Sequence, residues 1–110
     1  MPLSSRARIE IYLPDAPKKA YRNALRAFER EFLETFGGCT IIKNIKGLYL
    51  SAEGKTDTDK IVLLYTDTPF EFRSNRAALS KYTDELRKAA HQATGEESIL
   101  IVVHEIYHSV

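Results

Sequence analysis

The sequence has few of the features that mark a secreted, membrane-spanning or nucleic-acid-coating protein. Its single cysteine, Cys39, cannot form an internal disulfide, so nothing calls for an oxidising compartment. No stretch approaches the ~20 apolar residues that a membrane helix needs, and residues 1–5 lack the basic and apolar regions of a signal peptide. The formal net charge is only +1, which argues against a main role in coating nucleic acid or anionic lipid. We therefore expect a cytoplasmic protein.

The composition is that of an ordinary folded domain. Of the 110 residues, 44% are hydrophobic and 28% are charged, which is typical of a soluble globular chain and not of a disordered one. This length fits one domain and leaves no room for a second. We expect a single domain over residues 1–110, with residues 1–6 flexible.

Four strands are predicted from alternating or continuous apolar runs. They are expected at residues 8–13, 40–42 together with 48–50, 61–65 and 99–108. A turn or bulge near Lys46 and Gly47 is expected to interrupt the second strand. The polar residues 53–59 are expected to form a hairpin loop before the third strand.

Two helices, each with one apolar face, separate these strands. The first is expected to begin at an N-cap on Asp15 and to end at the pair Gly37 and Gly38. The second is expected over residues 75–94, with Ser74 as its N-cap. The apolar side chains that should face the core are, on the first helix, Tyr21, Leu25, Phe28, Phe32 and Phe36, and on the second, Leu79, Tyr82, Leu86, Ala89 and Ala93.

The resulting order is the split βαβ pattern, and residues 7–108 resemble a ferredoxin-like domain. Segments 35–40 (Thr-Phe-Gly-Gly-Cys-Thr) and 65–69 (Tyr-Thr-Asp-Thr-Pro) are similar to junctions in small bacterial proteins of this shape. The resemblance implies an α+β fold, a βαββαβ sandwich in which two helices cover one face of an antiparallel sheet. Because this fold hosts enzymes, regulators and nucleic-acid binders alike, the resemblance implies no particular activity.

The second face of this sheet is expected to need a cover. A half-exposed strand should alternate between apolar and polar residues, yet residues 61–64 and 99–103 are apolar on both faces. Large exposed apolar patches usually mark interfaces, and a second copy related by a two-fold axis is the simplest cover. We therefore expect a homodimer through the open sheet face. The alternative is that the first strand and residues 43–59 fold over that face within one chain.

Residues 104–108 read His-Glu-Ile-Tyr-His and match H-E-x-x-H, the zinc-binding signature of zincin metalloproteases. In such an enzyme His104 and His108 would be zinc ligands and Glu105 the general base. On a helix this spacing brings the two histidines within reach of one ion, whereas on a strand it spans about 13 Å. Because the segment is rich in Ile and Val, we predict a strand, on which the match is accidental. Zinc hydrolysis remains the alternative function.

Two further groups of residues are candidates for binding. Basic residues recur at i, i+4 along the first helix and could contact an anion or a nucleic acid, although a solvated helix face explains them as well. Tyr65, Asp67 and Thr68, at the end of the third strand, could line a small pocket, with Tyr12 and Tyr49 as possible neighbours. The anion-binding candidates are Lys18, Arg22, Arg26 and Arg30. The ligand-binding or interface candidates are Tyr12, Tyr65, Asp67, His104, Tyr107 and His108. We expect a binding or interaction domain with no cofactor and no catalytic residue.

Overall fold

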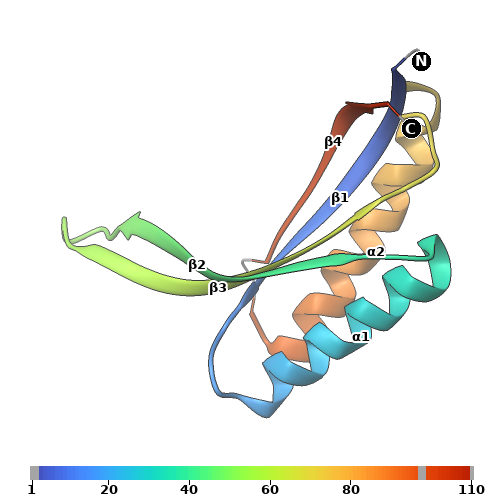
Figure 1. The fold of residues 1–110 in the computed structure, drawn as a ribbon. Helices are drawn as coiled ribbons and strands as arrows, with labels where there is room; N and C mark the ends of the chain where they lie inside the picture. Colours follow the sequence, from blue (N-terminus) through green and yellow to red (C-terminus); the bar gives the residue numbers. More distant parts are fainter. Residues whose placement is uncertain (1–2, 97–98, 110) are drawn as a thin grey trace.

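The six predicted elements form in the predicted order. A computed structural model describes residues 3–96 and 99–109. The elements are β1 (Ser4–Pro14), α1 (Lys19–Phe36), β2 (Thr40–Leu50), β3 (Thr56–Asp67), the short 3-10 turn η1 (Arg73–Asn75), α2 (Arg76–Thr94) and β4 (Leu100–His108) (Figure 1). Neither helix is long and apolar enough to cross a membrane, within the parts of the chain that the structure describes.

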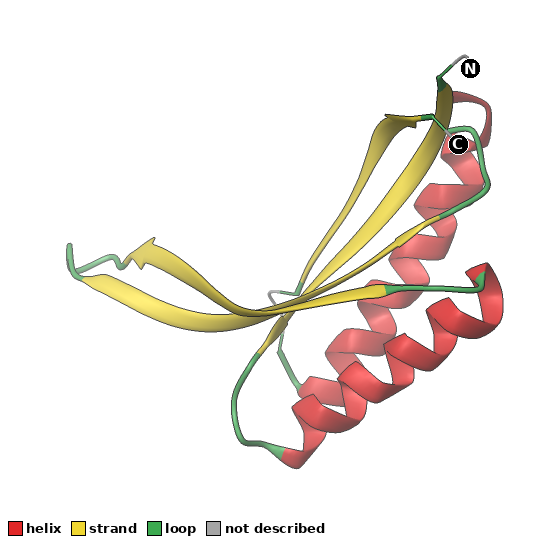
Figure 2. Cartoon of the chain, viewed as in Figure 1, coloured by secondary structure: helices red, strands yellow, loops and turns green. Residues whose placement is uncertain are grey.

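The four strands form one antiparallel sheet in the order β2-β3-β1-β4. Strand β1 lies in the centre and pairs with β3 on one side and β4 on the other. Both helices cover the same face of this sheet (Figure 2). The chain therefore has the α+β ferredoxin-like fold, as the sequence predicted. We call the face without helices the open face.

The core lies between the sheet and the helices, because β1 alternates strictly. Ala7, Ile9, Ile11 and Leu13 are essentially inaccessible to solvent and meet side chains from both helices and from β3. The remaining core residues include Phe28, Phe32, Val62, Leu64, Leu79, Leu86 and Ala90. Burying a side chain of this size stabilises the fold by roughly 1.5–3 kcal/mol, so this layer supplies most of the stability.

Both helices end as predicted but begin later than predicted. Gly37 and Gly95 adopt left-handed backbone angles and close α1 and α2, respectively. Asp15 does not cap α1: its backbone N–H donates to the carbonyl of Lys60 across the sheet, so the chain leaves the sheet only after it. Helix α2 begins at Arg76, because Ser74 lies within η1 and bonds to Glu71 instead.

The strands are longer than predicted. Strand β1 starts at Ser4, so residues 4–6, expected to be flexible, pair with the end of β4. Strand β2 runs unbroken to Leu50, and its irregularity lies between Ile42 and Ile45 instead of at Lys46 and Gly47. The polar residues 56–59, expected in a loop, open β3; they are compatible with a strand because both of its faces are exposed there.

The β2–β3 hairpin extends well beyond the sheet. Strand β1 pairs with β3 only as far as Ile61, so residues 46–60 form a two-stranded ribbon, which we call the arm. Figure 1 shows the arm curving away from the helices. Its side chains Leu48 and Leu50 are 61% and 76% exposed. The arm does not fold back over the open face, so the single-chain cover considered above is wrong.

Candidate functional site

The most distinctive polar arrangement lies on the open face, across three adjacent strands. The alternation that buries Ala7 to Leu13 places Arg8, Glu10 and Tyr12 on the opposite side of β1. The registers then set these three residues beside Leu63, Tyr65 and Asp67 of β3, and Leu100, Val102 and His104 of β4. Charged and aromatic side chains from distant parts of the sequence thus meet on one surface.

Arg8 organises one half of this surface. Its Nε and Nη2 donate hydrogen bonds of 2.6 and 3.0 Å to the two carboxylate oxygens of Asp67. Its guanidinium also lies 4.3 Å from the centre of the Tyr65 ring, a cation–π contact. The hydrogen bonds to Asp67 are the main reason that the pKa of Arg8 is raised above its usual value. Such a two-point pair fixes both side chains in one geometry.

Glu10 organises the other half. One of its carboxylate oxygens accepts a hydrogen bond of 3.2 Å from the Tyr12 hydroxyl. The other lies 3.3 Å from Nε2 of His104, without the alignment of a hydrogen bond. Burial, followed by the charge of Glu10, raises the pKa of Tyr12.

The structure brings together four of the six predicted interface candidates: Tyr12, Tyr65, Asp67 and His104. The sequence analysis missed the two residues that connect them. Arg8 and Glu10 carry the signal of a half-exposed strand, but only the registers with β3 and β4 show which partners they have.

The other two candidates lie apart from this group. His108 is on the same face but at its far end, opposite Ser4. Tyr107 is on the helix-facing side, where its hydroxyl donates to Glu105 at 2.9 Å. The Glu105 carboxylate also accepts a hydrogen bond of 2.8 Å from the Ser5 hydroxyl. Glu105 and Tyr107 therefore belong to a structural cluster at the end of β4.

The H-E-x-x-H match lies on strand β4, as predicted. His104 stands opposite Arg8 and His108 opposite Ser4, four residues apart along an extended backbone. That spacing separates the two residues by about 13 Å, too far for both rings to bind one ion. Within the described residues, no three His, Cys, Asp or Glu side chains form a group suited to a metal. This geometry does not fit the zincin arrangement.

The basic candidates lie on the helix layer, away from the open face. Lys18 occupies the N-cap position of α1, with its amino group 5.3 Å from the centre of the Tyr21 ring. Arg22, Arg26 and Arg30 follow along the exposed side of the helix. They form no shared site with the polar residues of the sheet.

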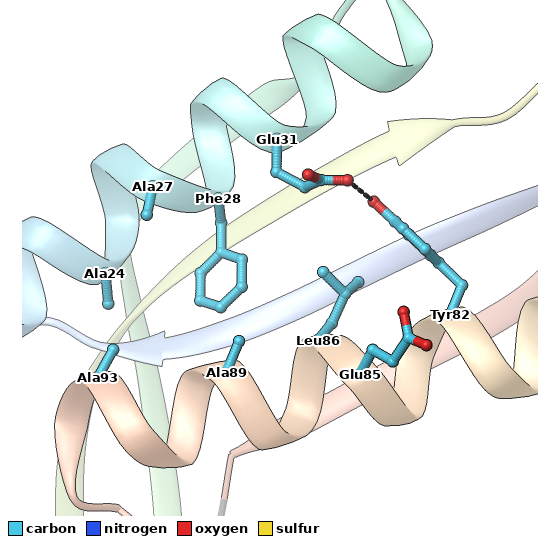
Figure 3. Close-up of a pocket in the computed structure, with 9 residues that line it drawn as sticks. All are labelled: Ala24, Ala27, Phe28, Glu31, Tyr82, Glu85, Leu86, Ala89 and Ala93. Carbon is cyan, nitrogen blue, oxygen red and sulfur yellow. Dashed lines mark hydrogen bonds between the residues drawn. The ribbon is translucent and has the colours of Figure 1, made fainter.

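A groove of about 300 Å³ runs between α1 and α2 (Figure 3). Figure 3 shows the hydroxyl of Tyr82 hydrogen-bonded to Glu31 across one end of it. Ala89 and Ala93, predicted to lie in the core, are exposed along its wall. The groove is a gap in helix packing bridged by one polar contact.

A second hollow, of about 270 Å³, lies at the base of the arm. Three tyrosines line it, Tyr12, Tyr21 and Tyr49. Tyr65 and Asp67, beside which the sequence analysis expected Tyr12 and Tyr49, are not part of this hollow. Its polar lining residues are Asp59, Lys60 and Glu96. It therefore offers aromatic faces together with charges of both signs.

The sequence matches no family model and no curated protein. Several solved structures match the fold. CutA1 from Oryza sativa is 18% identical, with a TM-score of 0.62 over 98% of this chain and 85% of that chain. CPII, a nitrogen regulatory PII-like protein from Thiomonas intermedia K12 bound to ADP, AMP and bicarbonate, is 17% identical, with a TM-score of 0.55 over 99% and 98%.

A phage SAM lyase in complex with S-methyl-5'-thioadenosine is 13% identical, with a TM-score of 0.63 over 96% of this chain and 88% of that chain. All three identities are low, so these similarities establish the ferredoxin-like fold and nothing more. A fold shared by proteins of such different description does not specify an activity.

Proposed function

We propose that this chain is a small, non-catalytic binding domain that associates with copies of itself and covers the open face in doing so. The observation that carries the proposal is an excess of exposed surface. The accessible surface is 7473 Å², about 1,300 Å² more than the ~6,200 Å² expected for a folded monomer of this mass. The radius of gyration, 15.2 Å, likewise exceeds the ~13 Å expected for 110 residues.

The chemistry of the open face supports the same proposal. Apolar side chains such as Ile42 and Leu100 are exposed on it. Three of its charged groups already have partners, Arg8 with Asp67 and Glu10 with Tyr12, so a second chain could cover these groups without isolating their charges. Because these groups bind one another instead of lining an empty cleft, the face favours binding over catalysis.

Two buried atoms on this face lack a hydrogen-bond partner among the described residues. They are Nε2 of His104 and Nε2 of His108. Buried polar atoms in folded proteins are nearly always satisfied. Both atoms are already shielded from solvent within one chain, so a second chain could bond to them only after the imidazole rings rotate. A homodimer is the smallest assembly that would cover the open face.

The test is the mass in solution, measured by light scattering or sedimentation at several concentrations. We expect at least twice the 12.5 kDa of one chain. Leu100→Glu should weaken association at least tenfold, because it places a charge in the covered surface. Ala20→Glu, an equally charged change on the exposed side of α1, should leave the mass unchanged. A wild-type protein that stays at the mass of one chain at ~100 µM would refute the proposal.

A second candidate function, binding of an adenine nucleoside, is favoured by the tyrosine-lined hollow at the base of the arm. Aromatic side chains stack on nucleobases, and Lys60 could face a phosphate. Two proteins of similar fold were solved with adenine compounds: ADP and AMP in one, S-methyl-5'-thioadenosine in the other.

Calorimetric titration with ADP and with S-methyl-5'-thioadenosine tests this candidate. We expect binding that Tyr12→Ala weakens at least tenfold and that Arg26→Ala, on the far side of α1, leaves unchanged. If neither compound binds at millimolar concentration, this candidate function is refuted.

A further inference from the structure

Strand β4 is an edge strand that lacks the usual protection against pairing. It is hydrogen-bonded to β1 on one side and, among residues 3–96 and 99–109, to no strand on the other. Its nine residues, Leu-Ile-Val-Val-His-Glu-Ile-Tyr-His, include no Lys, Arg, Pro or Gly, and its register with β1 has no irregularity. The one acidic residue, Glu105, is engaged with Ser5. An unprotected edge of this kind offers free backbone groups to which another strand can pair.

The opposite edge of the sheet is protected over part of its length. Strand β2 carries Lys43 and Lys46, and its register shifts between Ile42 and Ile45. Lysines and bulges are two of the devices that block pairing at an edge. Beyond them the outer edge of the arm becomes regular and apolar, over residues 48–50.

We propose that the outer edge of the arm of one copy pairs with β4 of a second copy. This rests on the proposed self-association and specifies the contact that produces it. The arm is a two-stranded ribbon without a covering helix, and such a ribbon alone is at best marginally stable in water. Pairing adds a third strand beside it and supplies partners for the free backbone groups of β4.

The second strand must come from another copy, because one chain cannot bring its own two edges together. The arm extends from the β2–β3 side of the sheet, whereas β4 forms the other edge (Figure 1). Two copies can exchange arms reciprocally about a two-fold axis, or more can close head to tail into a ring. The surplus surface of about 1,300 Å² exceeds the ~800 Å² per partner of a standard interface.

Direct pairing of β4 with β4 of a second copy is the competing arrangement. It would supply hydrogen-bond partners for the backbone groups at the edge of β4, but it would leave the arm without a third strand beside it. Pairing of the arm with β4 accounts for both exposed features with a single contact.

The test is cross-linking between two separately labelled populations. In a Cys39→Ser background, one population carries Leu48→Cys and the other Tyr107→Cys, at positions 61% and 57% exposed. After mixing and subunit exchange, a short bis-maleimide should join the two populations into a species of twice the mass. Each population alone should give little product. As a control, the second population carries Gln92→Cys, at an exposed position on α2, in place of Tyr107→Cys. This pair of populations should give no mixed product.

The outcomes separate the two proposals. An oligomer that gives no mixed product refutes pairing of the arm with β4 while leaving self-association intact. Product from Tyr107→Cys alone supports pairing of β4 with β4 and likewise refutes it. A protein that stays a monomer refutes both.

A second measurement uses the unaltered protein and so does not depend on the variants folding. Amide hydrogen exchange should slow at least tenfold, in β4 and in residues 46–50 together, as the concentration is raised through the association range. Slowing in neither of these segments, while the mass increases, would refute the proposal.

Discussion

Arg8 and Asp67 face each other across strands β1 and β3, where the guanidinium donates two hydrogen bonds, of 2.6 and 3.0 Å, to the carboxylate. The two residues are 59 positions apart in the sequence. The pair lies on the open face at the end of β3, where it links β1 to its neighbour.

Asp67→Asn should lower the free energy of unfolding by about 0.5 kcal/mol, because a partly exposed ion pair contributes little more than this. The loss should shrink when 0.5 M salt is added, since salt screens the pair. Urea denaturation measures both effects. Asp57→Asn, on the exposed arm, is the control and should change stability less.

Tyr82→Phe should destabilise the protein by about 1 kcal/mol at pH 8. The substitution removes the hydroxyl of α2 that donates a hydrogen bond to Glu31 of α1. Burial, followed by the hydrogen bond to Glu31, raises the pKa of Tyr82 strongly. The folded state therefore keeps this proton after the unfolded chain begins to lose it near pH 10.

The contribution of Tyr82 to the free energy of unfolding should thus be present below about pH 10. It should be lost as the pH rises towards the raised pKa of Tyr82. Denaturation at pH 8, 10 and 11 should show a smaller alkaline loss in Tyr82→Phe than in the wild type. Tyr49→Phe, on the exposed arm, should behave like the wild type. An unchanged alkaline slope in Tyr82→Phe would contradict the prediction.

Glu71→Gln should reduce the loss of stability in acid. The Glu71 carboxylate accepts hydrogen bonds from the backbone N–H groups of Arg73 and Ser74 and from the Ser74 hydroxyl. The bond from Arg73 is the largest cause of the lowered pKa of Glu71. The contribution of the Glu71 carboxylate to the free energy of unfolding is present above the pKa of a glutamate in the unfolded chain, near 4.3. It is lost as the pH falls through the lowered pKa of Glu71 in the folded state.

Denaturation between pH 6 and pH 3 measures this effect. Glu34→Gln, which removes an exposed carboxylate from α1, should keep the acid slope of the wild type. Equal acid slopes in Glu71→Gln and the wild type would show that the turn at η1 does not depend on this carboxylate.

The protein should bind no stoichiometric zinc through residues 104–108, because the extended backbone of β4 separates the two histidines. Elemental analysis of protein purified without a histidine tag measures the zinc content per chain. One zinc per chain, lost in His104→Ala and retained in His91→Ala, would contradict the prediction.

Local pattern was enough to predict most of the fold. The alternation in β1, the apolar runs of β3 and β4, and the glycines that close both helices each reflect a constraint carried by neighbouring residues. The start of α1 was misplaced because Asp15 bonds to Lys60 across the sheet, a contact that no local pattern reveals.

The candidate site was predicted only in part for the same reason. Tyr65 and Asp67 could be named as residues at a strand end, Tyr12 as their possible neighbour, and His104 as a residue of the H-E-x-x-H match. That Arg8 and Glu10 connect them depends on the registers of β1 with two other strands. The extension of the arm was missed because the polar residues at the start of β3 look like a loop when their pairing with β2 is unknown.

Asn44 has a backbone φ of 63°, the only positive value among the described residues other than glycine, and lies within the register shift of β2. Asparagine tolerates this left-handed conformation, whereas a β-branched residue resists it. A left-handed residue thus lies in the irregularity from which the hairpin departs, outside the hydrophobic core. Asn44→Val should strain this irregularity while the core of the domain stays intact.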